Sequence, residues 1–297
     1  MPLLHHGGIE SSGVWLTLSI ALTALVYLRG WLRLRSTSAS GISVWRVISF
    51  LLGLWLIWAA IASPIAALDH ELLTVHMLQH LLLMTLAPPL IWLGAPFMML
   101  LHGLPRQFVD KVIGPLLHSA PVQTTGGMLT QPALCWFAAA AALVGWHIPA
   151  LFTLGLQSEG WHLAEHASFL ATGLLFWWPV VQPWPSVSRG PELSMILYLF
   201  LATLPCDILS GFLVFCDRVV YPVYFASSRP FGISALEDQQ CAGALMWTFV
   251  TVVYVVAGAV LATGVLSRQS FREDEIGSVG ITWQSSSAKG AADLEAF

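Results

Sequence analysis

Residues 76–96, HMLQHLLLMTLAPPLIWLGAP, decide how the chain folds. They form an apolar run of about the length that a helix needs to cross the hydrocarbon core of a bilayer. His76 and His80 lie near its start, four residues apart, so on a helix they share one face. A polar nitrogen in lipid must find a partner, and an ionisable residue inside a membrane span therefore indicates a functional site.

The composition predicts an integral membrane protein. Of the 297 residues, 57% are apolar and only 9% are charged, against about 25% charged residues in an average soluble domain. The mean hydropathy is +0.75. The basic residues are too few and too scattered for a nucleic-acid surface, so the expected partner is the lipid bilayer and not a nucleic acid.

The hydropathy pattern predicts an all-α fold, a polytopic bundle of seven transmembrane helices. Residues 1–13 form an outer segment, 14–266 the membrane domain, and 267–297 a cytoplasmic tail whose Ser, Gly, Ala and charge predict disorder. The spans are expected at about 14–34, 44–66, 72–93, 131–150, 161–181, 192–214 and 240–266.

The basic residues predict an N-terminus outside and a C-terminus in the cytoplasm. Only Arg218 and Arg229 fall on the outer side, whereas the other ten of the 12 lysines and arginines fall on the inner side, as the positive-inside rule requires. Residues 1–13 carry no basic stretch, so the first apolar segment is expected to span the membrane and not to be a cleaved signal.

Two features of the inner half are expected to interrupt this pattern. Pro88 and Pro89 are expected to kink or break the third span. The inner segment 94–130 contains an amphipathic stretch that is expected to lie along the membrane interface.

Polar and metal-binding side chains converge at one depth, the outer half of the membrane. His76 and His80 are expected roughly 6 and 12 Å below the outer end of the third span, at about 1.5 Å per residue. Near the outer ends of the next four spans lie His147, then His162 and His166, then Cys206 and Asp207, and finally Glu237 and Asp238.

Spans three and five carry the same pattern, because HMLQH (76–80) and HLAEH (162–166) are both Hxx(Q/E)H. Each pair presents two imidazoles on adjacent helical turns, as ligands of one metal ion do. We therefore predict a metal site with the ligands His76, His80, His162, His166, His147 and Asp207. The predicted partners that orient these ligands are Gln79, Glu165, Glu237 and Asp238. Gln79 and Glu165 could also serve as ligands or proton acceptors themselves.

The residues leave the metal and the chemistry open. Imidazole suits copper and zinc equally, and nearby Met and Cys favour copper, while facing histidines also hold haem. HLAEH matches the HxxEH motif of zinc peptidases, so an intramembrane peptidase is the enzymatic alternative. Each histidine alone could also serve only to bind a backbone carbonyl. Cys206, Cys216 and Cys241 could be ligands, disulfide-bonded or inert.

Several blocks of the sequence, in this order, resemble the CtaG-type cytochrome c oxidase assembly factors of bacteria, which are associated with caa3-type oxidases. The blocks cover roughly residues 70–250 and are HMLQHLLLMTLAPPLIWLGAP, GWHIPALF, HLAEHASFLATGLLFWWPVV, LPCDILSGFLVF, YPVY and EDQQCAGALMW. The resemblance implies a multi-pass protein of the bacterial plasma (inner) membrane that is not an enzyme and whose partner is an oxidase subunit.

Together these observations lead to a hypothesis of copper delivery. The copper centres of haem–copper oxidases lie towards the outer side of the membrane, the depth at which the histidines converge. We expect the chain to bind copper there and to pass it to an oxidase subunit. A metal-free scaffold that holds unfinished subunits is the alternative from another class, and a homo-oligomer is left open.

Overall fold

The computed structural model describes residues 6–37, 42–181, 192–227 and 230–294, and every element in these ranges is helical. The prediction of an all-α fold is thus confirmed. The elements are α1 (His6–Thr37), α2 (Val44–Ala62), η1 (Ala66–Leu68), α3 (Leu73–Leu81), η2 (Leu82–Leu86), α4 (Ala87–Leu93), α5 (Pro96–Gly103), α6 (Arg106–Phe108), η3 (Val109–Ile113), α7 (Gly114–His118), α8 (Ala120–Leu129), α9 (Pro132–Trp146), α10 (Pro149–Gln157), α11 (Glu159–Val181), α12 (Glu192–Phe215), η4 (Pro222–Ala226), η5 (Pro230–Gly232) and α13 (Ala235–Leu294).

Among the described helices, five are long and apolar enough to cross a membrane, which indicates a multi-pass membrane protein. A sixth span results if α8 and α9, which meet at an angle of 66°, are counted together. Helix α11 has 23 residues but is not among the five. The five are Gly13–Ser36, Val44–Ala62, Leu73–Leu93, Leu193–Phe215 and Ala235–Gly264. The predicted seventh span and the predicted orientation stay predictions.

The third span stays continuous through Pro88 and Pro89. After α3 the backbone widens into one π-helical turn, η2, and the prolines occupy the first positions of α4. A π-helical turn takes up the break in the hydrogen-bond ladder that proline causes. Leu73–Leu93 therefore forms one span of 21 residues, with a π-helical turn just after His80 in place of the expected break.

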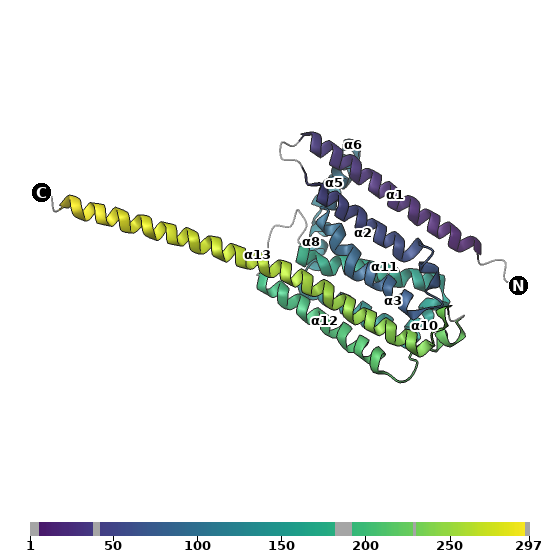
Figure 1. Ribbon diagram of the computed structural model, residues 1–297. Helices are drawn as coiled ribbons and strands as arrows, with labels where there is room; N and C mark the ends of the chain where they lie inside the picture. Colours follow the sequence, from purple (N-terminus) through teal and green to yellow (C-terminus); the bar gives the residue numbers. More distant parts are fainter. Residues whose placement is uncertain (1–5, 38–41, 182–191, 228–229, 295–297) are drawn as a thin grey trace.

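The helices form a bundle in which α12 and α13 lie side by side and α1 covers the opposite flank (Figure 1). The large core is built by α3, α9, α11, α12 and α13, while α1, α2 and α5 share a smaller core around Tyr27 and Phe50. Helices α1 and α5 are in backbone contact, because a Cβ on Gly30 would collide with the carbonyl oxygen of Met99.

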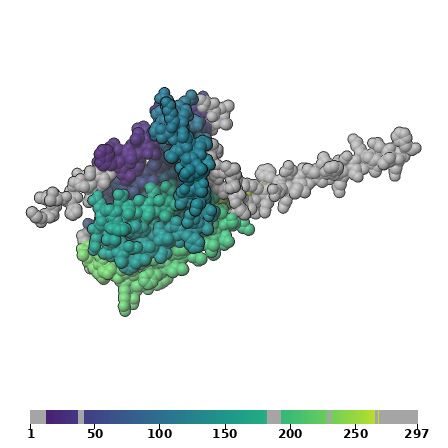
Figure 2. All heavy atoms as spheres, turned by 180° about the vertical axis from the view of Figure 1, so that it is seen from behind, coloured from purple at the N-terminus to yellow at the C-terminus, as the bar shows by residue number. Residues whose placement is uncertain are grey.

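Two segments lie outside this bundle. Residues 106–130, which follow α5, form a column across its surface (Figure 2), and they expose apolar side chains such as Phe108, Leu116 and Met128. Helix α13 continues to Leu294 and projects beyond the bundle (Figure 1). The disordered tail that the composition indicates for 267–297 stays a prediction.

Candidate metal centre

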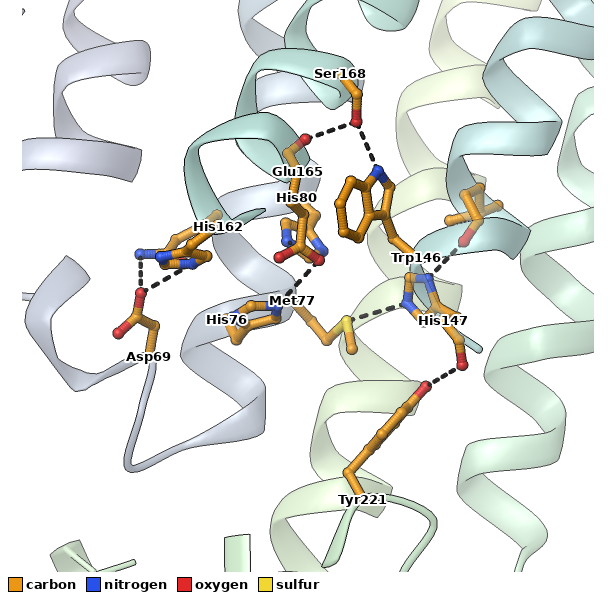
Figure 3. Close-up of polar contacts among 12 residues, drawn as sticks. Asp69, His76, Met77, His80, Trp146, His147, His162, Glu165, Ser168 and Tyr221 are labelled. Atoms are coloured by element: carbon orange, nitrogen blue, oxygen red, sulfur yellow. Dashed lines mark hydrogen bonds and ion pairs between the residues drawn. The ribbon is translucent and has the colours of Figure 1, made fainter. Parts of the chain in front are cut away.

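A buried carboxylate and two buried imidazoles face one another between α3 and α11 (Figure 3). Oε1 of Glu165 lies 3.5 Å from Nε2 of His76 and 3.4 Å from Nε2 of His80. The side chains of His76 and Glu165 are 0% exposed. One atom from each of the three residues lies within 4.8 Å of the other two, which is close enough for all three to bind the same ion.

These polar atoms lack the hydrogen bonds that buried polar atoms normally have. Both ring nitrogens of His76 and of His80 and both carboxylate oxygens of Glu165 have no hydrogen-bond partner among the described residues. Burying a polar group without a partner costs about 1–3 kcal/mol. A cation bound between the three side chains would compensate for this cost.

A second group shares His76 and lies nearer the surface. It comprises Asp69, His76 and His162, whose ligand atoms also lie within 4.8 Å of one another. The Asp69 carboxylate lies 3.5 Å from Nε2 of His162 and 3.7 Å from Nε2 of His70. The sequence reasoning missed Asp69, although the run of Asp69, His70 and Glu71 directly before a histidine-bearing span was a signal that could have found it.

The imidazoles form a series that leads from the surface into the bundle. The ring centres are 5.7 Å apart from His70 to His162, 5.7 Å from His162 to His76, 4.3 Å from His76 to His80, and 6.3 Å from His80 to His147. The side chain of His70 is 56% exposed, whereas that of His76 is fully buried. An ion could thus move inward by exchanging one imidazole ligand for the next.

The other predicted ligands lie outside the two groups. His166 is buried, with its ring centre 4.2 Å from that of His162 and 5.9 Å from that of His80. His147 contacts the carbonyl of Leu143 through Nδ1 and the sulfur of Met77 through Nε2. Asp207 belongs to neither group, and its Oδ1 is buried with no hydrogen-bond partner among the described residues.

The predicted orienting residues act on the backbone and on Asp69 more than on the histidines. The Gln79 amide donates to the Asp69 carboxylate at 3.3 Å and to the Ala66 carbonyl at 3.2 Å. Glu237 is exposed and accepts hydrogen bonds from the backbone and hydroxyl of Ser234, which forms a capping box at the start of α13. Glu165, predicted as an orienting partner, lies directly between the histidines of α3.

Asp238 holds the helix that carries His76 and His80. Its carboxylate accepts hydrogen bonds from the backbone N–H of Leu73 at 2.6 Å and of Thr74 at 3.1 Å, and from the Thr74 hydroxyl at 2.6 Å. These N–H groups are in the first turn of α3 and have no partner within the helix. Asp238 thus fixes the start of α3 against α13.

Two tyrosines of the loop between α12 and α13 hold the two sides of the centre. The Tyr221 hydroxyl donates to the carbonyl of His147 at 3.0 Å, and the Tyr224 hydroxyl donates to the carbonyl of Asp69 at 2.8 Å. Burial raises the pKa of both phenols, so both stay protonated and able to donate at neutral pH. The motif YPVY, which the sequence indicates only as a loop, is therefore part of the support of the centre.

Gly155 on α10 makes room for the carboxylate of Glu165. A Cβ at this position would lie 2.8 Å from Oε2 of Glu165. Phe152, one turn earlier, packs its ring against that of His76, with centres 4.9 Å apart. Helix α10 thus closes one side of the centre.

The cysteines contribute no disulfide within the described residues. Cys135 and Cys206 are buried free thiols, Cys216 is half-buried and Cys241 is exposed. Neither group of ligand atoms includes a cysteine.

Comparison with known proteins gives distant relatives that are all uncharacterized. The chain is 25% identical over 241 residues to the uncharacterized protein ML1998 of Mycobacterium leprae. The aligned region covers 77% of this chain and 36% of that relative. It is 26% identical over 248 residues to the uncharacterized protein Mb0105 of Mycobacterium bovis. This aligned region covers 81% of this chain and 37% of that relative. The chain therefore spans only about a third of the length of these relatives.

No solved structure matches the chain. The model of the family described as cytochrome c oxidase caa3 assembly factor matches residues 25–268, which include both groups of ligand atoms. The chain belongs to the family of caa3-type cytochrome c oxidase assembly factors.

Proposed function

We propose that the chain is an assembly factor of cytochrome c oxidase that binds copper between α3 and α11 and delivers it to an oxidase subunit. The observation that carries the proposal is the trio of His76, His80 and Glu165. All three are buried and lack hydrogen-bond partners within the described structure, and Oε1 of Glu165 lies 3.4–3.5 Å from Nε2 of each histidine. Copper is the cargo of the protein in this account.

The donor atoms support a directly bound ion. Imidazole nitrogen and carboxylate oxygen suit both copper and zinc, and the copper content of the oxidase that the family assembles favours copper. The space in front of the coordinating nitrogens is occupied, because Oε1 of Glu165 lies 3.5 Å from Nε2 of His76 and 3.4 Å from Nε2 of His80. This favours an ion over a haem, whose porphyrin ring would need that space beside its axial nitrogen.

The position of Glu165 favours delivery over peptide hydrolysis. A zinc peptidase of the HxxEH type would bind its zinc through His162 and His166 and use Glu165 as general base. Here Glu165 lies against the histidines of α3, where it has the position of a ligand. We therefore assign the chain a role in assembly and no peptidase activity.

The proposal includes a seven-span topology in the bacterial inner membrane, with the N-terminus outside. Helices α9 and α11 complete the seven spans in this account. The N-terminal end of α1 and the short helix α10, which closes the centre, lie at the same end of the bundle (Figure 1). The centre would then face the side on which the copper of the oxidase is inserted.

The test is the copper content of the oxidase in cells that lack this chain. We expect an oxidase whose ratio of copper to haem is lowered, with recovery when the wild-type chain is restored or when copper is added in excess to the medium. A scaffold role predicts loss of the oxidase subunits themselves, with no rescue by copper. Oxidase with its full copper content in these cells would contradict the proposal.

The variant Gly155→Ala is expected to weaken copper binding about tenfold, the size of effect seen when the support of a metal ligand is removed. The added methyl group would lie 2.8 Å from Oε2 of Glu165 and would push the carboxylate away from the histidines. The free energy of unfolding is expected to change little, because the displaced atom is the end of a flexible side chain.

Copper affinity and thermal unfolding of the purified variant check this prediction. Gly160→Ala is the matched control, because a Cβ there would have no atom closer than 4.0 Å. Equal copper affinity of the two variants would show that the position of Glu165 does not matter for binding.

A further inference from the structure

We infer a second metal site, specific for monovalent copper, that is formed by the sulfur of Met77 and Nε2 of His147. It deepens the proposed function, on whose copper part it rests. The two side chains come from α3 and from the end of α9 and are almost completely buried. Their atoms are 3.2 Å apart (Figure 3).

The hydrogen bond of the other ring nitrogen assigns the tautomer of His147. Nδ1 lies 2.7 Å from the carbonyl oxygen of Leu143, which can only accept, so Nδ1 carries the proton. In the neutral imidazole Nε2 then has a free lone pair. A thioether sulfur has no proton to donate. Two lone pairs therefore face each other, which is the arrangement of two ligands and not of a hydrogen bond.

The separation of the two atoms fits two neighbouring ligands on one ion. Metal–nitrogen and metal–sulfur bonds of about 2.0 and 2.3 Å that meet at the tetrahedral angle hold their donor atoms about 3.5 Å apart. The observed distance is 3.2 Å, so a side-chain movement of a few tenths of an ångström lets both atoms bind one ion.

A small cavity with further sulfur atoms adjoins the pair. Its volume is about 40 Å³, enough for an ion with its remaining ligands and too small for a porphyrin. Its other walls are mostly apolar. The cavity is lined, among others, by Met77, His147, His80, Met84, Cys206 and Met246. Thioether and thiol ligands select monovalent copper over divalent ions, so this site is more selective for monovalent copper than the nitrogen–oxygen site of His76, His80 and Glu165.

His80 connects the two sites. It lines the cavity and also faces Glu165 at 3.4 Å. The ring centres of His80 and His147 are 6.3 Å apart. An ion held by His76, His80 and Glu165 can therefore move onto His147 and Met77 while His80 stays within reach of it. The ion is monovalent throughout, so the step exchanges ligands and transfers no electron.

The test compares Met77→Leu with Met99→Leu in the full-length protein. Leucine keeps approximately the volume of methionine and removes only the sulfur. Met99 is equally buried but belongs to the separate core of α1, α2 and α5, so it controls for the loss of a buried methionine. The proteins are titrated anaerobically with monovalent copper against a chromophoric chelator, and X-ray absorption reports sulfur bound to copper. Cobalt(II), which prefers nitrogen and oxygen ligands, reports the first site through its optical spectrum.

We expect Met77→Leu to lose the copper–sulfur signal and to bind monovalent copper at least tenfold more weakly, with unchanged cobalt binding. Met99→Leu should behave like the wild type. An unchanged sulfur signal and affinity in Met77→Leu would overturn the second site. Absence of cobalt binding in all three proteins, with the sulfur signal lost only in Met77→Leu, would overturn the first site and support the second.

Discussion

Replacing Glu165 by glutamine is expected to lower the copper affinity about a hundredfold or more, without destabilising the metal-free protein. The carboxamide keeps the shape of the side chain but removes the negative charge and the best ligand atom between His76 and His80. Loss of a residue that merely supports a ligand already costs about 10–100-fold in metal affinity. Loss of a ligand itself should cost at least as much.

The same substitution should leave the unfolding temperature of the metal-free protein unchanged or raise it. A buried carboxylate with no hydrogen-bond partner among the described residues is costly in the absence of metal, and a neutral amide costs less. Copper content and thermal unfolding, with and without copper, measure both effects. Glu159→Gln, an exposed carboxylate in the first turn of the same helix, is the control. A variant that binds copper as the wild type does, or unfolds far below it, would contradict the ligand role.

The double variant His76→Ala/His80→Ala is expected to produce oxidase as deficient in copper as cells that lack the chain. It removes two of the three residues of the group of His76, His80 and Glu165. It also removes His76 from the second group, which contains Asp69 and His162, so both groups lose ligands. The measurement is the ratio of copper to haem in purified oxidase, together with the amount of the chain in the membrane. The amount of the chain in the membrane distinguishes loss of its function from loss of the protein itself.

The control for this variant is His102→Ala/His118→Ala. Both residues are exposed, and each contacts a carbonyl of its own helical segment. Oxidase with full copper content from His76→Ala/His80→Ala, present at the wild-type level, would mean that these histidines only hold the bundle together.

Much of the candidate centre could be predicted because its histidines are spaced for helices. The separation of four residues puts His76 above His80, and the depth of spans three and five brings His162 and His166 to the same level. The sequence left open whether Glu165 orients a histidine or is itself a ligand. Each residue turns a helix by about 100°, so the packing of α11 against α3 decides whether a histidine or the glutamate points into the centre.

The residues that were missed act through contacts distant in sequence. Asp69 lies in the connection between α2 and α3, and its position depends on Tyr224, which is 155 residues away. Gly155 matters because Glu165 of a different helix needs its space. Met77 could not be singled out from the sequence, since a methionine in an apolar span has the same pattern whether it packs or binds a metal. Only the opposing lone pair of His147 distinguishes the two roles.

The fold itself follows the hydropathy pattern except where proline and polar residues alter a span. Pro88 and Pro89 were expected to kink or break the third span; the break is absent, because the π-helical turn before them keeps the span continuous, and the kink stays a prediction. Hydropathy does not indicate a π-helical turn, because one extra residue in a turn leaves the apolar character of the span unchanged. Helix α11 carries the centre's polar residues in its first turns, which is why its assignment as a span depends on where the centre lies in the membrane.

Elemental analysis of the detergent-purified protein, with its optical spectrum, tests the central claim most directly. The account predicts copper in a fixed ratio to the chain, absent from the His76→Ala/His80→Ala variant, and no Soret band. A protein that still supports oxidase assembly but contains no copper, even after reconstitution with the metal, would contradict it.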